Sequence, residues 1–290
     1  METAESDKIY RKVGVVVFLD ALGIKHLGIE KSIDFIEKRK KFLEECRYIR
    51  DKRVEEFKRE LNINFPVPDI ALFQDSIIFT WEEQEPKQDP EKYHFSFFQA
   101  VGQWLMDVVT EAIKDGLFFR GAISQGEYIV NMSYQNVTII GPAVDDASDF
   151  FENADWIGVI QTPDCEKKYI SYLKTVAEKD SIRLGAATNL DDVIHHYRFL
   201  FVRYPVPLSI KKIDFFSLKS DSLSLRKEFY VSSWPVMACK IEPRISISNI
   251  LLRHSISEKP KHQSKYYHTY LFLEWYKAKF WEGLKPQVDE

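Results

Sequence analysis

The sequence predicts an α+β protein with a ferredoxin-like or palm core, in which helices cover one face of an antiparallel-rich sheet. Residues 13–19 are β-branched and apolar on both faces, which is typical of a central strand covered on both sides. The predicted elements that begin with this strand follow in the order β, α, β-β, α, β. This order, with the buried first strand, indicates the fold class.

Hydrophobic periodicity and turn residues place the remaining elements. An amphipathic helix capped by Ser32 is expected over residues 32–61, strands over 69–73 and 76–81, and a second helix over 93–114. A strand at 117–124 is followed by a turn at Gln125-Gly126-Glu127, strands at 128–131 and 137–140, a helix at 142–152 and a strand at 156–161. We expect one domain over residues 1–290, with its core at about 11–165. Weaker signals in 166–290 predict helices at 164–177 and 264–281 and strands at 199–202, 213–216 and 228–233, which complete the fold.

Composition excludes several classes of protein. The chain has 290 residues, 45% of them hydrophobic, so it can bury a large core. Its net charge is −4 and its sequence has no basic cluster of the kind that binds DNA or RNA. Its longest apolar run is far shorter than the roughly 20 residues that span a bilayer, and its start lacks a signal-peptide pattern, so we expect a cytoplasmic protein that does not bind membranes. The three cysteines are far apart and are expected to be buried thiols.

Two aspartates stand where predicted strands end. Asp20 follows the central strand, and Asp75 lies at the tip of the hairpin predicted over 69–81. Neighbouring strands would bring both carboxylates together, as a two-metal phosphoryl-transfer site requires. The backbone N–H groups of Ala21, Leu22 and Gly23, at the entry to a helix, are expected to hold phosphates. Taken singly, each aspartate is also explained as a helix cap or a turn residue.

Four motifs resemble those of the class III nucleotide cyclases. Phe18-Leu19-Asp20-Ala21-Leu22-Gly23 is similar to their first metal motif and Phe73-Gln74-Asp75-Ser76 to their second. The segment from Phe119 to Glu127 resembles the strand and turn that follow, and the segment from Gly141 to Ala147 resembles the start of their dimer-facing helix. Within that family the greatest similarity is to the pyrimidine cyclases of the bacterial Pycsar anti-phage systems, which also resemble this chain at Trp156 to Val159 and at Tyr230 to Pro235.

The resemblance implies an activity and a set of ligands. It implies cyclisation of UTP or CTP to the 3′,5′-cyclic monophosphate with loss of pyrophosphate, by a homodimer whose sites lie at the interface. It implies two Mg²⁺ or Mn²⁺ ions per site, with Asp20, its neighbour Leu19 and Asp75 as the expected metal ligands. The cyclic nucleotide would act as a second messenger on an effector that no residue here identifies.

Departures from the family pattern bear on the base and on catalysis. Adenylyl cyclases read adenine with a Lys and an Asp, and the matching positions in this chain are Ala71 and Thr138. These two residues cannot replace that pair, which disfavours ATP as the substrate but does not exclude GTP. The positions of the transition-state Asn and Arg are Asp145 and Asp149, which would repel a developing phosphate charge. Either other cations act in this chain or the site is inactive.

Three further residues complete the predicted site. Arg120 lies within a predicted strand and is expected to reach a phosphate or a base carbonyl, or else to pair with Glu127 or Asp75. Phe73 is on the same side of its strand as Asp75 and is expected to stack on the base, with core packing as the alternative. Lys211, next to Lys212, lies roughly where cyclases keep a triphosphate-binding lysine, although a solvated pair explains this doublet equally well.

Other functions remain open at this point. A purine cyclase would keep both aspartates and differ in its pocket. A diguanylate cyclase would carry a G-G-D/E-E-F-like turn, which Phe73-Gln74-Asp75-Ser76 lacks. A cyclase-like domain without turnover would bind nucleotide or a partner protein.

Overall fold

The N-terminal half of the chain forms a βαββαβ unit. The computed structural model describes residues 8–24, 28–61, 67–83, 90–133, 137–184, 200–209, 226–242, 244–257 and 260–281. Within them the first elements are β1 (Lys8–Ala21), α1 (Ile29–Leu61), β2 (Asp69–Phe73), β3 (Ser76–Glu82), α2 (Pro90–Lys114) and β4 (Phe119–Met132). These strands lie in the order β2-β3-β1-β4, and each neighbouring pair is antiparallel. The predicted ferredoxin-like or palm core is therefore confirmed.

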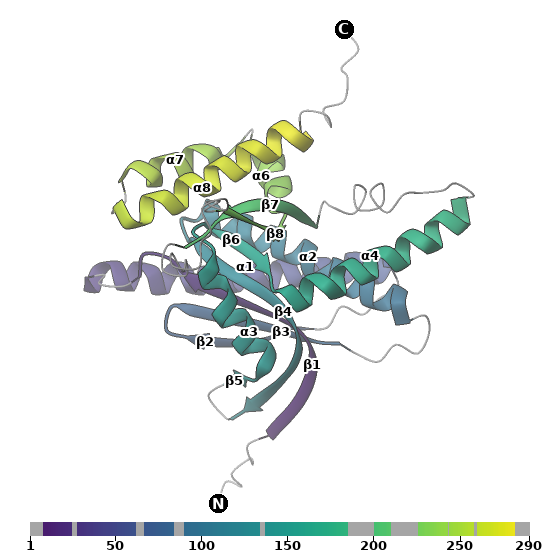
Figure 1. The fold of residues 1–290 in the computed structure, drawn as a ribbon. Coiled ribbons are helices and arrows are strands. Elements are labelled where there is room, and N and C mark those ends of the chain that lie inside the picture. The colour runs from purple at the N-terminus through teal and green to yellow at the C-terminus, as the bar shows by residue number, and fades with distance from the viewer. Residues whose placement is uncertain are drawn as a thin grey trace, which may run out of the picture.

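The second half of the chain extends the same sheet. Its elements are β5 (Val137–Ile140), α3 (Pro142–Phe150), the 3-10 turn η1 (Phe151–Asn153), β6 (Gly158–Gln161), α4 (Pro163–Leu184), β7 (Phe201–Pro207) and β8 (Arg226–Ser232). Strand β6 pairs in parallel with β4 and leads to β8 and β7, while β5 pairs with the far end of β4. The helices α6 (Pro235–Ile241), α7 (Ile247–Ser257) and α8 (Pro260–Tyr276), with the π-helical turn η3 (Lys277–Trp281), follow. Figure 1 shows α7 and α8 side by side at the end of the molecule that carries β7 and β8.

The two faces of the sheet are covered differently. Side chains alternate along β1, so Val15 and Val17 enter the main core with α1 and α2. Val16 points the other way, into a smaller apolar cluster with Val144 of α3, and Phe18 packs against this cluster. The expectation that helices lie on one face only is therefore wrong: Figure 1 shows α3 in front of the sheet and α1 and α2 behind it.

The β1–β4 pair is longer than the sequence indicates. The predicted turn at Gln125-Gly126-Glu127 is wrong, because these residues continue β4 and pair with Val15, Gly14 and Val13 of β1. Cross-strand pairing therefore overrides the turn propensity of glycine and its neighbours. Beyond the helices, β1, β4 and β5 project as an arm, visible at the bottom of Figure 1.

The first helix begins earlier than predicted. Ser32 was expected to cap it, but α1 starts at Ile29, and both the N–H and the hydroxyl of Ser32 donate to the carbonyl of Gly28. The cysteines are free and buried, as predicted. None of the described helices has the length and the hydropathy that crossing a membrane requires.

Candidate active site

The fold brings Asp20 and Asp75 to the same end of the sheet, as predicted. Asp20 is the last but one residue of β1 and lies opposite Ser76 of β3. Asp75 belongs to the two-residue turn between β2 and β3. The N–H of Ala21 donates to the main-chain carbonyl of Asp75 at 3.0 Å, which fixes this turn against the end of β1.

The turn that carries Asp75 has a second support from α1. Gln74 has a positive φ of 50°, which is uncommon for a residue other than glycine. A guanidinium N–H of Arg39 donates to the carbonyl of Gln74, and the same guanidinium lies 5.5 Å from the centre of the Phe35 ring. Sequence reasoning missed Arg39, because it is one of many charged residues on a long amphipathic helix.

Arg120 is paired with Asp20. Its Nε and Nη2 both donate to Oδ2 of Asp20 at 3.0 Å, and the Ser76 hydroxyl lies 3.4 Å from Oδ1. The Arg120 guanidinium also lies 4.8 Å from the centre of the Phe151 ring, which stacks on Phe18 at 5.2 Å. This cross-strand pair between β1 and β4 supplies the cation that a partly buried carboxylate needs.

The ion pair that sequence analysis allowed for Arg120 has a different partner from those considered. Glu127 lies further along β4 and binds Arg11 at 2.7 Å in an exposed pair. The carboxylate of Asp75 makes no hydrogen bond or ion pair with any described side chain. One carboxylate of the predicted pair therefore has a counterion, and the other has none among the described residues.

The electrostatics of the pair favour a cation. Burial raises the pKa of Asp20, Arg120 opposes this shift, and the negative charge of Asp75 raises the pKa further. Two carboxylates that repel each other in this way gain most from a cation placed between them. The charge of Asp75 therefore acts on Asp20, as a site shared by both carboxylates would require.

The described residues can hold divalent ions with few protein ligands. No group of three or more His, Cys, Asp or Glu side chains with metal-binding geometry occurs in the described part of the chain. Asp20 and Asp75 are two carboxylates, and Mg²⁺ is commonly bound through one or two carboxylates together with substrate phosphates and water. The side chain of Leu19 is fully buried in the main core, on the face opposite Asp20, so it has only main-chain atoms to offer.

The predicted phosphate cradle after Asp20 is only partly available. The chain does not enter a helix here, because α1 begins at Ile29. The N–H of Ala21 is used by Asp75, and the N–H of Leu22 donates to the carbonyl of Phe118 at 2.8 Å. Gly23 follows in a turn with a positive φ of 82°. The expectation of a helix N-terminus at residues 21–23 is therefore wrong.

The residues predicted to face the base lie in different environments. Phe73 is the last residue of β2, opposite Ser76, and its side chain is 68% exposed rather than packed in the core. Ala71 is buried in the smaller apolar cluster with Ile78. Thr138 is exposed on β5. An exposed aromatic residue therefore lies in the hairpin that carries Asp75, and the position of the adenine-reading lysine is occupied by a buried alanine.

Helix α3 carries negative charge on the face of the sheet that holds Asp20. Asp145 and Asp149 are one turn apart and exposed. Neither is paired with a described cation in a salt bridge. Lys211 and Lys212, the predicted triphosphate-binding position, lie outside the described residues.

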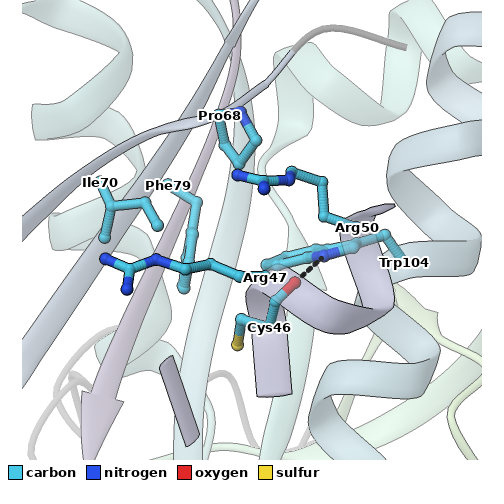
Figure 2. Close-up of a pocket in the computed structure, with 7 residues that line it drawn as sticks. All are labelled: Cys46, Arg47, Arg50, Pro68, Ile70, Phe79 and Trp104. Carbon is cyan, nitrogen blue, oxygen red and sulfur yellow. Dashed lines mark hydrogen bonds between the residues drawn. The ribbon is translucent and has the colours of Figure 1, made fainter. Parts of the chain in front are cut away.

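A small crevice elsewhere is separate from this site. It is lined by Cys46, Arg47, Arg50, Pro68, Ile70, Phe79 and Trp104, and Figure 2 shows the indole N–H of Trp104 donating to the carbonyl of Cys46 across it. Phe79 belongs to the main core and Ile70 packs against it, on the face of the sheet that α1 and α2 cover. The crevice therefore opens away from Asp20, which lies on the other face.

Comparisons with known proteins give only distant similarities. Neither a protein-family model nor a curated protein matches this sequence. Among solved structures, the adenylyl cyclase CyaB from P. aeruginosa is 16% identical over 77% of this chain and 95% of its own, with a TM-score of 0.38. The catalytic core of a rhodopsin-guanylyl cyclase with converted specificity, in complex with ATPαS, is 12% identical over 79% of this chain and 98% of its own, with a TM-score of 0.41. The guanylate cyclase domain of RhGC from Catenaria anguillulae, in complex with GTP, is 11% identical over 77% of this chain and 97% of its own, with a TM-score of 0.39. Similarities this distant do not identify a reaction, so the function rests on the residues of the site.

Proposed function

We propose that this protein is a metal-dependent nucleotide cyclase that converts UTP or CTP into the 3′,5′-cyclic monophosphate and pyrophosphate. The observation that carries the proposal is the convergence of Asp20 and Asp75 at one end of the sheet, with Arg120 bound to Asp20. Two carboxylates and an arginine at one site suit a triphosphate that arrives with divalent ions.

The reaction requires little covalent chemistry from the protein. The ribose 3′-oxygen forms a bond to the α-phosphorus, the bond from that phosphorus to the bridging oxygen breaks, pyrophosphate leaves, and the hydroxyl proton passes to solvent. Two ions, Mg²⁺ or Mn²⁺, would lower the pKa of the hydroxyl and neutralise phosphate charge. Asp20 and Asp75 would hold these ions, and Arg120 would bind phosphate oxygens through its planar fork.

The preference for a pyrimidine is supported by the base-facing residues. Ala71 and Thr138 lack the charges with which adenylyl cyclases read adenine, and Ala71 is surrounded by apolar side chains. The exposed ring of Phe73 is available to stack on a small base. UTP and CTP fit these features equally.

We further propose that the active form is a homodimer with a site at each side of its interface. The arm formed by β1, β4 and β5 exposes large apolar side chains, including Ile9, Val13 and Ile140, which a second copy would cover. The enzyme would act in the cytoplasm, where its triphosphate substrates are found. A role as source of a second messenger in anti-phage defence belongs to the same proposal and is supported by the motif resemblance.

A second candidate is a cyclase-like module that binds nucleotide without turnover. Asp145 and Asp149 favour it, because exposed acids at the positions of the transition-state Asn and Arg add negative charge where a phosphate would need stabilisation. A purine cyclase is the third candidate, since it would retain Asp20 and Asp75.

One experiment separates these candidates. The purified protein is incubated with ATP, GTP, CTP or UTP and Mn²⁺, and the products are resolved by mass spectrometry. Asp75→Asn tests the site, and Asp164→Asn is the matched control, because Asp164 is an exposed aspartate that pairs with Lys167 on the surface of α4. A cyclic pyrimidine product that Asp75→Asn abolishes and Asp164→Asn keeps would establish the proposal. A cyclic purine would refute the base assignment, and binding without product would favour the inactive module.

A further inference from the structure

Asp20 and Asp75 are not equivalent, although both are proposed metal ligands. The Asp20 carboxylate is neutralised by Arg120, and their side chains are only 16% and 21% exposed. The Asp75 carboxylate has no ion pair among the described residues. An ion that binds Asp75 meets a carboxylate without a described counterion, whereas an ion that binds Asp20 meets one already held by a guanidinium.

The Arg120–Asp20 pair opposes metal binding at Asp20. A divalent ion at Asp20 would lie within a few ångströms of the guanidinium, and like charges at that distance repel strongly at a partly buried site. Relief of this repulsion requires another anion for Arg120. The phosphates of the substrate supply one, because arginine binds phosphate in the same bidentate manner as carboxylate.

Arg120 is placed so that it can change partners. It lies on the same face of the sheet as Asp20, its side chain is 21% exposed, and its guanidinium lies over the ring of Phe151, a buried residue of the main core. The contact with this ring does not depend on the carboxylate, so it can retain the side chain near the site while the ion pair is exchanged. The Ser76 hydroxyl stays beside Asp20 on the strand opposite.

We propose that Arg120 is an exchangeable counterion of Asp20, which it holds until a triphosphate arrives and then leaves for the phosphates, so that metal and triphosphate load together. This inference rests on the proposed function. The exchange couples the two ligands: the triphosphate raises metal affinity at Asp20, and the metal raises triphosphate affinity at Arg120 by the same factor. A site that loads in this way binds a metal ion more weakly when no substrate is present.

The first test measures Mn²⁺ binding without nucleotide, from the EPR signal of free Mn²⁺. Arg120→Gln removes the counterion, and Arg11→Gln is the matched control, because Arg11 lies on the same sheet in an exposed pair with Glu127. We expect Arg120→Gln to bind Mn²⁺ about fivefold more tightly than the wild type, or more, and Arg11→Gln to bind as the wild type does. Unchanged affinity in Arg120→Gln, or an equal gain in both variants, would overturn the proposal.

The second test reverses the roles and keeps the proposal falsifiable if Arg120→Gln does not fold. Binding of inorganic tripolyphosphate to the metal-stripped protein is measured by calorimetry for Asp20→Asn and Asp75→Asn. Both variants lose one negative charge, but only Asp20→Asn releases Arg120, so it should bind at least about fivefold more tightly than Asp75→Asn. Equal affinities would refute the exchange. Neither test uses turnover, so a protein that shows the coupling and forms no cyclic product would refute the cyclase function alone.

Discussion

Gly121 is the residue at which a single methyl group would disturb the candidate site most directly. It follows Arg120 on β4, and a Cβ placed on it would lie 2.2 Å from the main-chain oxygen of Phe18 and 2.8 Å from Cδ2 of Leu19. The Phe18 oxygen belongs to β1, which is paired on both sides, so β1 and β4 would have to separate by about 0.8 Å to restore even a 3.0 Å contact. Overpacking of this kind costs about 1–3 kcal/mol.

The matched substitution is Gly126→Ala on the same strand. The nearest neighbour of the added methyl group would be Cβ of Ala143 at 3.5 Å, an ordinary contact. The change also lowers the conformational entropy of the unfolded chain, which stabilises the folded protein by about 0.4–1 kcal/mol. This gain is common to both variants, so equilibrium urea unfolding, with the m-values compared, should show Gly121→Ala about 1–3 kcal/mol less stable than Gly126→Ala. A difference below about 0.5 kcal/mol would mean that the β1–β4 contact yields easily, and would refute the reasoning.

Two other substitutions test the supports of the site and of the helix layer. Arg39→Met removes the donor to the Gln74 carbonyl, so Mn²⁺ binding measured by EPR should weaken about two- to fivefold. Lys38→Met, on the same helix, is the control and should have no effect. Equal effects of the two substitutions would contradict a specific support of the Asp75 turn by Arg39. Arg53→Met leaves Asp107 partly buried without its cation, and should cost about 2–3 kcal/mol of unfolding free energy near neutral pH. Burial raises the pKa of Asp107 and Arg53 opposes this shift, so removal of Arg53 should raise the pKa of Asp107 in the folded variant further. The variant should therefore recover its lost stability as the pH falls through the raised pKa and Asp107 becomes protonated. An equal loss of stability in urea unfolding at about pH 4.5 and at neutral pH would contradict this pH dependence.

Local sequence was sufficient to predict the parts of the fold in which one element decides its own structure. The apolar run before Asp20 predicts a central strand, and the strand-turn-strand pattern around Asp75 predicts a hairpin; both occur. Because the order of elements limits the sheet to few topologies, the sequence also predicted that these two aspartates lie close together. The candidate site is predictable to this extent because it depends on where strands end.

The parts that failed depend on contacts between segments far apart in the sequence. Gly126 and Glu127 have turn propensity, but their β1 partners keep them in a strand. Arg39 and Phe151 support the site from a helix and from a 3-10 turn, and no motif marks either residue. The position of α3 on the second face is likewise fixed by packing, with Val144 as one of its contacts, and not by the residues at its ends.

The β1–β4 ladder, whose length the sequence did not indicate, is what places Arg120 opposite Asp20. The two strands pair without interruption from Lys8 with Met132 to Ala21 with Phe119. A shift of one residue in this register would turn Arg120 to the face covered by α1 and α2, where it would be buried without a partner. The long arm therefore sets the register that the ion pair requires, and the counterion proposed for Asp20 is specified as much by the far end of the sheet as by the residues of the site.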